Sequence, residues 1–326
     1  MEAKEISEVM KRISAVGIVP VIKLDDEKDA VPLARALCEG GIPVAEVTFR
    51  TAQAEGAIRR IAEGVPEMLV GAGTVLTTGQ VDRAVGAGAR FIVSPGLNPR
   101  VVAYCREKGI PVVPGCANPS DIEAALELGL DTVKFFPAEA MGGVKVLKAL
   151  SAPYGAVKFM PTGGVNAANL NDYLSMGNVV ACGGSWMVKP ELIAAGDFAA
   201  ITALSREAVA KMLDIRLAHI GINGADCGEA ANIAGLFALL LGAQIKEGAK
   251  SFFAGPSVEI MKNDGRGRLG HIAFSANSVE RALFQLELRG FKADGESFKR
   301  DASGKLTFAY LEGDFGGFAV HLTLKN

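Results

Sequence analysis

A lysine interrupts an apolar segment near the middle of the chain. Residues 131–139 read Asp-Thr-Val-Lys-Phe-Phe-Pro-Ala-Glu, so Lys134 lies among strand-forming residues and Pro137 must end the strand. Burial disfavours the charged form of an amine, and a neutral amine attacks carbonyl carbons to form Schiff bases. The alternative is a lysine whose stem packs at a strand end while its ammonium group reaches water. Lys134 is therefore a candidate nucleophile.

A carboxylate stands in another apolar segment. Glu46 falls within the predicted strand 44–49, and Arg50 follows the end of that strand. A carboxylate tuned by burial and by a nearby lysine can act as a general acid and base, whereas the alternative is a structural ion pair with Arg50 or Lys134. Arg50 offers a planar fork that suits a substrate carboxylate, unless it is an ordinary surface arginine. The two residues extend the candidate site beyond the lysine.

The first two thirds of the chain alternate between strand and helix patterns. Helical stretches separate eight apolar runs, at residues 17–22, 44–49, 68–72, 90–94, 111–114, 132–136, 157–161 and 179–182. Strict alternation favours an α/β fold with a parallel sheet and outer helices, and eight units favour closure into a (β/α)₈ TIM barrel. An open doubly wound sheet is the alternative. A barrel carries its chemistry directly after the C-terminal ends of its strands, where the unusual residues of this chain fall.

Glycine-rich turns follow several of these strands. Gly163-Gly164 comes after the seventh strand and Gly183-Gly184 after the eighth. Glycine lets backbone N–H groups approach an anion closely, and the N-terminus of a following helix favours negative charge. In barrels this pair of turns is the usual phosphate site. The turns therefore predict an anion site near the candidate lysine.

Together these segments resemble the 2-keto-3-deoxy-6-phosphogluconate (KDPG) / 4-hydroxy-2-oxoglutarate (KHG) aldolase family. The matching motifs occur in family order: Glu46-Val47-Thr48-Phe49-Arg50-Thr51, Gly71-Ala72-Gly73-Thr74-Val75, Ser94-Pro95-Gly96, Lys134-Phe135-Phe136-Pro137-Ala138-Glu139, Pro161-Thr162-Gly163-Gly164 and Gly183-Gly184-Ser185-Trp186. The resemblance implies a class I aldolase that needs no cofactor or metal, assembles as a homotrimer and acts on a small 2-keto acid.

The resemblance also implies a role for each matching residue. Lys134 would form the Schiff base and Glu46 would shuttle protons, while Arg50 and Thr74 would hold the pyruvate end of the substrate. The pocket would be shaped by Pro95 and Phe136. The distal phosphate or hydroxyl would be received by Thr162, Gly163, Gly164, Gly184 and Ser185.

Two substrates fit this resemblance. The enzyme would cleave KDPG to pyruvate and glyceraldehyde 3-phosphate, KHG to pyruvate and glyoxylate, or both. A phosphate-binding epimerase or isomerase is the alternative, because such barrels share the glycine turns. That alternative gives no task to a strand lysine beside Glu46 and Arg50.

The rhythm of the chain changes in its last third. A strand, a helix and two more strands are expected at 216–223, 230–241, 250–254 and 257–262, and a similar order follows at 270–275, 279–289, 291–294, 306–312 and 316–324. The repetition predicts an α+β domain of duplicated βαβββ units. We therefore expect an aldolase barrel at residues 1–213 and a second domain at 214–326. The second domain resembles the vicinal-oxygen-chelate (glyoxalase-like) superfamily, through its rhythm and the motifs around His219 and His271.

All histidines of the chain lie in this last third. In metal-binding members of that superfamily the ligands come from the first and last strands of each unit, and the resemblance puts His219, Glu259, His271 and His321 at these positions. Imidazole and carboxylate ligands suit Zn²⁺, Ni²⁺ or Fe²⁺. The alternative is a set of core imidazoles in a domain without metal. The domain would be catalytic, or would sense a ligand and regulate the aldolase.

Composition limits the other classes of function. The formal net charge is −2 without a basic block, so nothing predicts nucleic-acid binding. No apolar run reaches the length that spans a membrane, and the first residues lack a signal-peptide pattern. The five cysteines are scattered and read as reduced thiols of a cytoplasmic protein.

Overall fold

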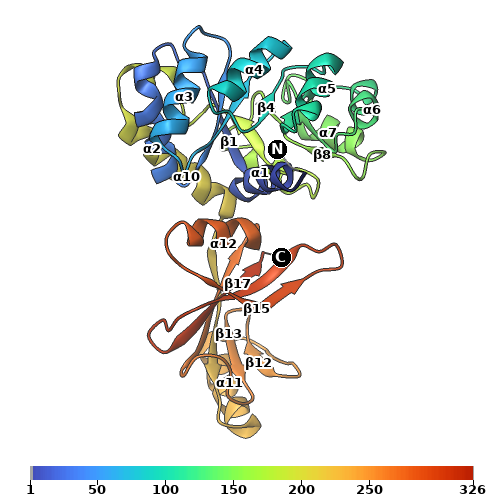
Figure 1. The fold of residues 1–326 in the computed structure, drawn as a ribbon. Coiled ribbons are helices and arrows are strands. Elements are labelled where there is room, and N and C mark those ends of the chain that lie inside the picture. Colours follow the sequence, from blue (N-terminus) through green and yellow to red (C-terminus); the bar gives the residue numbers. More distant parts are fainter. Residues whose placement is uncertain (1–2, 326) are drawn as a thin grey trace. The chain divides into compact units, whose positions relative to one another are not determined.

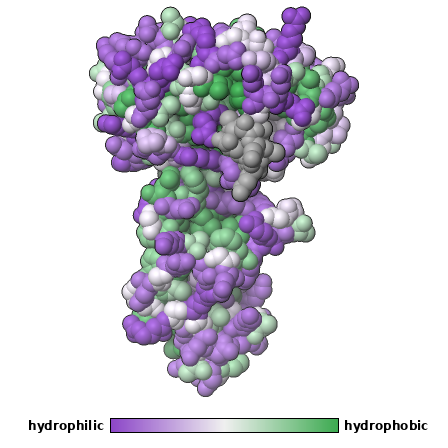
Figure 2. All heavy atoms as spheres, in the orientation of Figure 1, coloured by the Kyte–Doolittle hydropathy of each residue, from purple (hydrophilic) through white to green (hydrophobic). Residues whose placement is uncertain are grey.

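The chain divides into two compact units. The structure is a computed structural model that describes residues 3–325. The first unit is Met1–Met212 and the second is Leu213–Asn326 (Figure 1). Hydrophilic residues cover most of the visible face of the first unit, with smaller apolar areas between them (Figure 2). Among the described residues, no helix is both long and apolar enough to cross a bilayer.

Strands and helices alternate along the first unit. Its strands are β1 (Ile18–Ile22), β2 (Val44–Thr48), β3 (Leu69–Gly73), β4 (Ile92–Val93), β5 (Val112–Val113), β6 (Gly115–Cys116), β7 (Thr132–Phe135), β8 (Lys158–Phe159) and β9 (Cys182–Gly184). Its helices are α1 (Ala3–Val16), α2 (Ala30–Glu39), α3 (Ala54–Gly64), α4 (Thr78–Gly86), α5 (Pro99–Glu107), α6 (Pro119–Glu127), α7 (Gly143–Ser151), α8 (Leu170–Leu174), α9 (Pro190–Ala194) and α10 (Phe198–Leu213). The helices surround the strands (Figure 1).

The strands of the first unit form a curled parallel sheet. One stretch has the order β5-β4-β3-β2-β1-β9 and another the order β6-β7-β8. Isolated parallel bridges join Phe159 to Val179 and Thr162 to Gly183, so pairing continues from β8 to β9 and then to β1. Every residue of β2 and β3 is buried, as expected of parallel strands covered on both faces. The curled parallel sheet confirms the α/β class predicted from the alternating pattern, whereas closure into a complete (β/α)₈ barrel stays a prediction.

Side-chain caps start the helices directly after the strand ends. Thr77 accepts a hydrogen bond from the backbone N–H of Gln80 at the start of α4. Asn98 and Asn118 cap α5 and α6 in the same way, and each is followed by a proline in the first turn, where the missing N–H costs nothing. The caps keep the connections after the strands short, so residues in these connections stay at one end of the sheet.

Some boundaries differ from the sequence expectations. Pro114 interrupts the expected strand 111–114 between β5 and β6, because it has no N–H to donate. Its carbonyl still accepts a hydrogen bond from the backbone N–H of Lys134 at 2.8 Å. A separate 3₁₀ turn at Glu27–Asp29 precedes α2. The last strand of the unit, β9, begins at Cys182, the final residue of the expected strand 179–182, and Val179 forms only an isolated bridge to Phe159.

The second unit repeats one order of elements. It contains β10 (Arg216–Asn223), α11 (Cys227–Leu241), β11 (Ile245–Glu247), β12 (Ser251–Ala254) and β13 (Val258–Met261), then β14 (Gly270–Ala276), α12 (Val279–Glu287), β15 (Ala293–Arg300), β16 (Leu306–Leu311) and β17 (Phe318–Leu324). The sheet order is β11-β12-β13-β10-β14-β17-β16-β15, so each half has the same internal order and the halves meet at β10 and β14. Strand β11 consists of only three residues, all of them exposed, and no strand was expected at its position from the sequence.

The two faces of this sheet differ. Ala230 and Ala234 of α11 pack on Phe252, Ala254 and Ile260, and α12 packs along β16 and β17. Side chains alternate between the two faces of a strand, so Glu259, next to Ile260, lies on the opposite face. His271 lies on that face too, because Glu259 and His271 are both register partners of Gly221. One face therefore forms the core and the other carries polar side chains.

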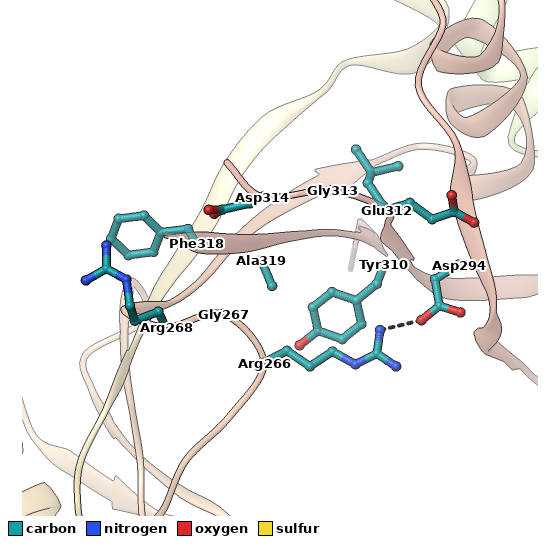
Figure 3. A pocket seen from close by; sticks show the side chains of 11 residues that line it. Arg266, Gly267, Arg268, Asp294, Tyr310, Glu312, Gly313, Asp314, Phe318 and Ala319 are labelled. Atoms are coloured by element: carbon teal, nitrogen blue, oxygen red, sulfur yellow. Dashed lines mark hydrogen bonds and ion pairs between the residues drawn. The ribbon is translucent and has the colours of Figure 1, made fainter. Parts of the chain in front are cut away.

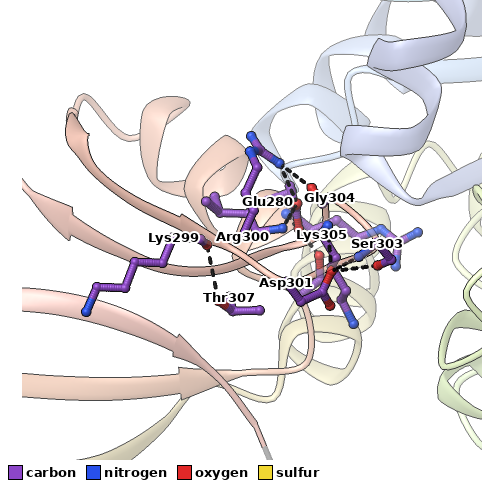
Figure 4. Close-up of polar contacts among 11 residues, drawn as sticks. Glu280, Lys299, Arg300, Asp301, Ser303, Gly304, Lys305 and Thr307 are labelled. Carbon is purple, nitrogen blue, oxygen red and sulfur yellow. Dashed lines mark hydrogen bonds and ion pairs between the residues drawn. The ribbon is translucent and has the colours of Figure 1, made fainter.

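A polar turn closes the hairpin between β15 and β16. Asp301 Oδ1 accepts hydrogen bonds from Ser303 N at 2.9 Å and from Lys305 N at 3.0 Å, and Arg300 donates to the carbonyl of Gly304 at 2.8 Å (Figure 4). An aspartate that accepts from nearby backbone donors stabilises a turn. Glu280 of α12 also contacts this hairpin: it accepts from the backbone N–H of Leu306 and pairs with Arg300 at 3.5 Å.

Candidate functional site

Lys134 and Glu46 meet in the interior of the first unit. The Nζ atom of Lys134 lies 3.3 Å from Oε1 and 3.5 Å from Oε2 of Glu46. Their side chains are only 6% and 1% exposed. Strands β7 and β2 do not pair with each other, so the two side chains reach one another across the inside of the curled sheet. The structure therefore brings the two candidate catalytic residues together.

Two neighbours shape the space around this pair. A Cβ atom on Gly73 would lie 2.1 Å from Glu46 Oε1, so glycine at the end of β3 leaves room for the carboxylate. The ring of Phe136 lies beside the amine, with its centroid 5.2 Å from Lys134 Nζ. An aromatic face stabilises the ammonium form and keeps water away from it.

The pair can exchange a proton. An ammonium group and a carboxylate that share a buried site can pass one proton between them, which leaves a neutral amine and a carboxylic acid. A neutral amine is the form that attacks a carbonyl carbon, and a carboxyl group within hydrogen-bond reach is a general acid and base. The geometry therefore suits a covalent reaction of the amine with a ketone or aldehyde.

Arg50 and Thr74 lie at the ends of β2 and β3. The Nε atom of Arg50 donates to Thr48 Oγ1 at 3.1 Å, and no described acidic side chain forms an ion pair with the guanidinium. Thr74 has a φ of 56°, a left-handed conformation that a β-branched residue adopts only under strain. Such strain gathers at functional sites. Both residues therefore lie at strand ends that a substrate could approach, and no described acidic side chain neutralises the charge of Arg50.

Pro95 borders the next turn. A Cβ atom on Gly115 would lie 2.0 Å from the carbonyl oxygen of Pro95, so this backbone lies directly against the strand beside β7. Ser94 Oγ donates to the carbonyl of Gly96 at 2.8 Å and holds the turn closed. Pro95 is thus held against Gly115 of β6, the register partner of Lys134, in agreement with its predicted role in shaping the pocket.

The predicted anion turns lie side by side. Thr162 and Gly183 form a parallel bridge, and a Cβ atom on Gly183 would lie 2.3 Å from Thr162 Oγ1. Gly163 and Gly164 adopt φ values of 98° and 86°, which favour glycine. The backbone N–H groups of these two glycines donate no hydrogen bond to any described residue. Unused N–H groups on adjacent glycines form a concave site that binds an oxyanion.

Gly184 and Ser185 complete this second turn. A Cβ atom on Gly184 would lie 2.0 Å from the indole ring of Trp186, so the ring covers the glycine directly. The backbone N–H of Ser185 also donates to no described residue. The five predicted phosphate-binding residues therefore fall in two turns joined by one bridge.

The sequence reasoning missed two residues near these turns. Glu139 ends the lysine motif but had no assigned role, and Tyr173 of α8 was not considered. The Tyr173 hydroxyl donates a hydrogen bond to Glu139 Oε1. A wholly buried tyrosine hydroxyl needs a partner, yet no sequence spacing identifies which acceptor supplies it.

The three histidines of the second unit form one cluster. They come from β10, β14 and β17, and one nitrogen of each lies within 4.8 Å of the others. The Nε2 atoms of His219 and His271 are 3.1 Å apart, and both approach Glu259 Oε2, at 3.1 and 3.0 Å. The structure therefore brings together all four residues that were predicted as metal ligands.

The charges in this cluster are unusual. Burial acts to raise the pKa of the Glu259 carboxyl, but hydrogen bonds from His219, His271 and Ser251 outweigh it and hold that pKa well below its usual range. Burial, together with the neighbouring imidazoles His271 and His219, lowers the pKa of His321 to about 3. The Nδ1 atom of His321 is buried without a hydrogen-bond partner among the described residues. The cluster therefore offers neutral imidazole nitrogen and carboxylate oxygen in one place.

Two other residues support the cluster. Ser251 Oγ donates to Glu259 Oε1 at 2.5 Å, so the other carboxylate oxygen is left for the imidazoles. A Cβ atom on Gly221 would lie 2.0 Å from the His271 ring, so glycine opposite His271 is a steric requirement. The sequence reasoning assigned neither role. The role of Gly221 can be seen only in the register between β10 and β14, and that of Ser251 only in its hydrogen bond to Glu259.

A cavity of about 440 Å³ opens on the same face of the sheet. Tyr310 and Ala319 line it and are the register partners of His321 and His271. The Tyr310 and His321 ring centroids are 5.1 Å apart. Figure 3 shows the guanidinium of Arg266 beside the Tyr310 ring, 4.6 Å from its centroid. A small molecule in this cavity would lie next to the histidine cluster.

Comparison with known proteins identifies the first unit. The family model for KDPG and KHG aldolase matches residues 7–204. The 2-dehydro-3-deoxy-phosphogluconate aldolase of Treponema pallidum is 52% identical over 199 residues, which cover 61% of this chain and 95% of the relative. The KHG/KDPG aldolase of Escherichia coli K12 is 48% identical over 192 residues, covering 59% of this chain and 90% of the relative.

A solved structure agrees with this match. The KDPG aldolase of Legionella pneumophila, with pyruvate captured at low pH as a covalent carbinolamine intermediate, is 42% identical, with a TM-score of 0.60. The match covers 61% of this chain and 97% of that structure. Because the family model spans more than half of its length, the chain belongs to the KDPG and KHG aldolase family and is an enzyme of the aldehyde-lyase class.

Proposed function

We propose that the first unit is a Schiff-base aldolase that releases pyruvate from KDPG, from KHG, or from both. One observation carries the proposal: the amine of Lys134 lies 3.3 Å from the carboxylate of Glu46 in a buried site. Support also comes from the relatives named for these substrates. The other products would be glyceraldehyde 3-phosphate from KDPG and glyoxylate from KHG.

The reaction begins with the attack of the Lys134 amine on C2 of the 2-keto acid. The amine gives up a proton as the C–N bond forms, and Glu46 can accept it and return it to the C2 oxygen. Glu46, protonated by its exchange with Lys134, then donates a proton to the C2 hydroxyl group, which leaves as water; the protonated imine and the Glu46 carboxylate result. The positive imine draws electrons from C3, which prepares the C3–C4 bond for cleavage.

Glu46 would next remove the proton of the C4 hydroxyl group. The C4 oxygen forms a carbonyl as the C3–C4 bond breaks, and the electron pair of that bond moves to C3 to give an enamine. After the aldehyde leaves, C3 takes a proton from the carboxylic acid of Glu46. Water hydrolyses the resulting imine, which releases pyruvate and restores the amine of Lys134.

The remaining site residues would position the substrate. Arg50, unneutralised by an acidic side chain, suits the pyruvate carboxylate, and Thr74 lies at the end of the strand beside it. Pro95 and Phe136 would shape the pyruvate pocket. The distal phosphate of KDPG would be held by the unused N–H groups of Gly163, Gly164 and Ser185, together with Thr162 and Gly184.

A coupled assay tests this proposal. Lactate dehydrogenase and NADH report pyruvate, and we expect the wild-type protein to release it from KDPG or KHG while Lys134→Met does not. Lys145→Met is the matched control, because α7 carries that lysine outside the pair. An epimerase or isomerase would convert its sugar phosphate without producing pyruvate. Failure of the wild-type protein to release pyruvate from either substrate would reject the proposal.

For the second unit we propose a vicinal-oxygen-chelate-like domain with a divalent metal site. The predicted division at residues 1–213 and 214–326 lies one residue from the boundary between the two compact units, and the repeated βαβββ order supports the proposal. Three imidazoles, a carboxylate and the unpartnered Nδ1 of His321 fit a divalent cation such as Zn²⁺, Ni²⁺ or Fe²⁺. His219, Glu259, His271 and His321 would hold it. A bound cation supplies Lewis-acid chemistry to an oxygen ligand.

Metal content tests this second proposal. The purified protein should carry about one equivalent of a divalent metal, and His271→Ala should carry much less. Glu259→Gln should also lose metal, whereas Glu247→Gln should not, because Glu247 pairs with Lys262 at the surface. Equal and negligible metal in the wild-type protein and in His271→Ala would end the metal proposal.

The second domain would either catalyse a reaction of its own or sense a ligand and regulate the aldolase. The cavity beside Tyr310 would hold the ligand in either case. A catalytic domain predicts turnover of a small oxygen-rich molecule that depends on Glu259. A sensing domain predicts that a 1–213 truncation keeps aldolase activity and loses its response to a metabolite. The homotrimer and the cytoplasmic location stay predictions.

A further inference from the structure

The turn that carries Gly163 and Gly164 is attached to the strand of the Schiff-base lysine. The backbone N–H of Ala138 donates to the carbonyl of Thr162 at 2.8 Å, and that of Glu139 donates to Gly163 at 3.0 Å. The distance between the distal anion site and the amine of Lys134 is therefore set through residues 135–139, which no proposed catalytic step uses.

Glu139 contacts the turn with its side chain as well. A Cβ atom on Gly164 would lie 2.5 Å from Cγ and 2.6 Å from Cβ of Glu139, so the stem of Glu139 lies directly on this glycine. Its carboxylate accepts the hydrogen bond of Tyr173, a residue of α8 that is wholly buried. Glu139 is thus held from two sides, by the turn and by the helix that follows the turn.

Two amides hold the other side of the same turn. Asn166 and Asn169 both donate from their side chains to the carbonyl of Gly164, at 3.0 and 3.2 Å. The N–H groups of Gly163 and Gly164 belong to the same peptides as the carbonyl groups of Thr162 and Gly163. Both carbonyls accept backbone hydrogen bonds, from Ala138 and Glu139, so the orientation of each peptide is determined. The N–H groups of these glycines are consequently held in the arrangement that leaves them available to an anion.

The Tyr173 hydroxyl is suited to a permanent hydrogen bond. Burial, and then the neighbouring Glu139 carboxylate, raise the pKa of Tyr173 above its ordinary value, so the hydroxyl keeps its proton. A buried hydroxyl next to a carboxylate forms a charge-assisted hydrogen bond, which is stronger than a neutral one. Tyr173 therefore restrains Glu139 across the whole neutral range of pH.

We infer that Glu139 and Tyr173 are a positioning pair that holds the Gly163–Gly164 turn at the distance from Lys134 required by a phosphorylated substrate. The inference rests on the proposed aldolase function and deepens it: the pair determines the preference for KDPG over substrates without a phosphate. Neither residue takes part in proton transfer or forms a bond to the substrate.

The test compares two reactions of one enzyme. Cleavage of KDPG needs the distal turn, whereas deuterium exchange into the methyl group of pyruvate needs only imine and enamine formation at Lys134. In Tyr173→Phe we expect the KM for KDPG to rise about tenfold, the equivalent of one charge-assisted hydrogen bond, with kcat within about twofold. The KM for pyruvate in the exchange reaction should stay unchanged.

Two further variants separate positioning from folding. Glu139→Leu keeps the stem against Gly164 but removes the acceptor, and should match Tyr173→Phe. Glu139→Gln keeps an acceptor oxygen and should restore much of the KM. Tyr154→Phe is the control, because Tyr154 donates a similar hydrogen bond to Glu123 at the surface, 2.9 Å long.

The outcomes distinguish this inference from the function on which it rests. Equal changes of both KM values in Tyr173→Phe, or no change in either, would overturn the positioning role even if the wild-type enzyme cleaves KDPG. A loss of kcat in both reactions would also overturn it, since that result indicates general damage. A wild-type protein that exchanges no pyruvate protons and cleaves no KDPG would reject the aldolase proposal, and this inference with it.

Discussion

The amine of Lys134 and the carboxylate of Glu46 lie 3.3 Å apart although their strands, β7 and β2, do not pair. Only a curled sheet brings two such strands within reach of each other's side chains. The contact is therefore a consequence of the fold, because residues 88 positions apart meet inside it.

Replacement of Glu46 by glutamine keeps the shape of the side chain and removes the carboxyl group that would act as general acid and base. We expect kcat for KDPG cleavage to fall by roughly 10²- to 10⁴-fold, the usual contribution of a general acid and base. Glu63→Gln is the control, since Glu63 is exposed on α3 and should leave kcat unchanged. A Glu46→Gln enzyme with wild-type kcat would remove Glu46 from the mechanism.

Replacement of Gly164 by alanine should damage the anion turn. The new Cβ atom would lie 2.5 Å from Glu139 Cγ, and the φ of 86° disfavours any side chain. We expect a stability loss of about 1–3 kcal/mol and a raised KM for KDPG. Gly155→Ala is the matched control, because nothing lies within 4 Å of its Cβ position. Similar KM values in the two variants would contradict the proposed phosphate site.

Replacement of Gly221 by alanine should displace His271. The added methyl group would lie 2.0 Å from the imidazole ring, so the ring would have to leave the cluster. We expect the metal content, measured by atomic emission, to fall as it does in His271→Ala. Gly235→Ala on α11 meets nothing within 4 Å and should keep the metal. Retention of metal by Gly221→Ala would mean that His271 is no ligand.

The cysteines should differ sharply in reactivity. Burial raises the pKa of Cys38, Cys105 and Cys116 to about 12, so their thiols stay protonated and unreactive at neutral pH. Cys182 is buried, and Cys227 is exposed. Brief alkylation of the native protein, read by peptide mass spectrometry, should modify Cys227 well before the other four. Early labelling of Cys116 would contradict the packing of the first unit.

The sequence was sufficient to predict which residues of the first unit come together around Lys134. A lysine in one apolar strand, a glutamate in another and paired glycine turns after later strands are all local patterns, and a curled parallel sheet brings such residues together. The pattern could not show that Gly73 makes room for Glu46, because that contact depends on the register of two strands.

Other features depend on contacts that leave no local pattern. Tyr173 and Glu139 are 34 residues apart and lie on different elements, so neither periodicity nor motif joins them. In the second unit the repeated order was visible in the sequence. Strand β11 was not, because three exposed residues carry no alternation of apolar and polar positions.

Trapping of the covalent intermediate tests the central claim most directly. The wild-type protein is treated with borohydride in the presence of pyruvate, and its peptides are analysed by mass spectrometry. We expect one reduced pyruvyl group per chain, located on Lys134, and no such group in Lys134→Met. A wild-type protein that stays unlabelled, or a label on another lysine, would contradict the account.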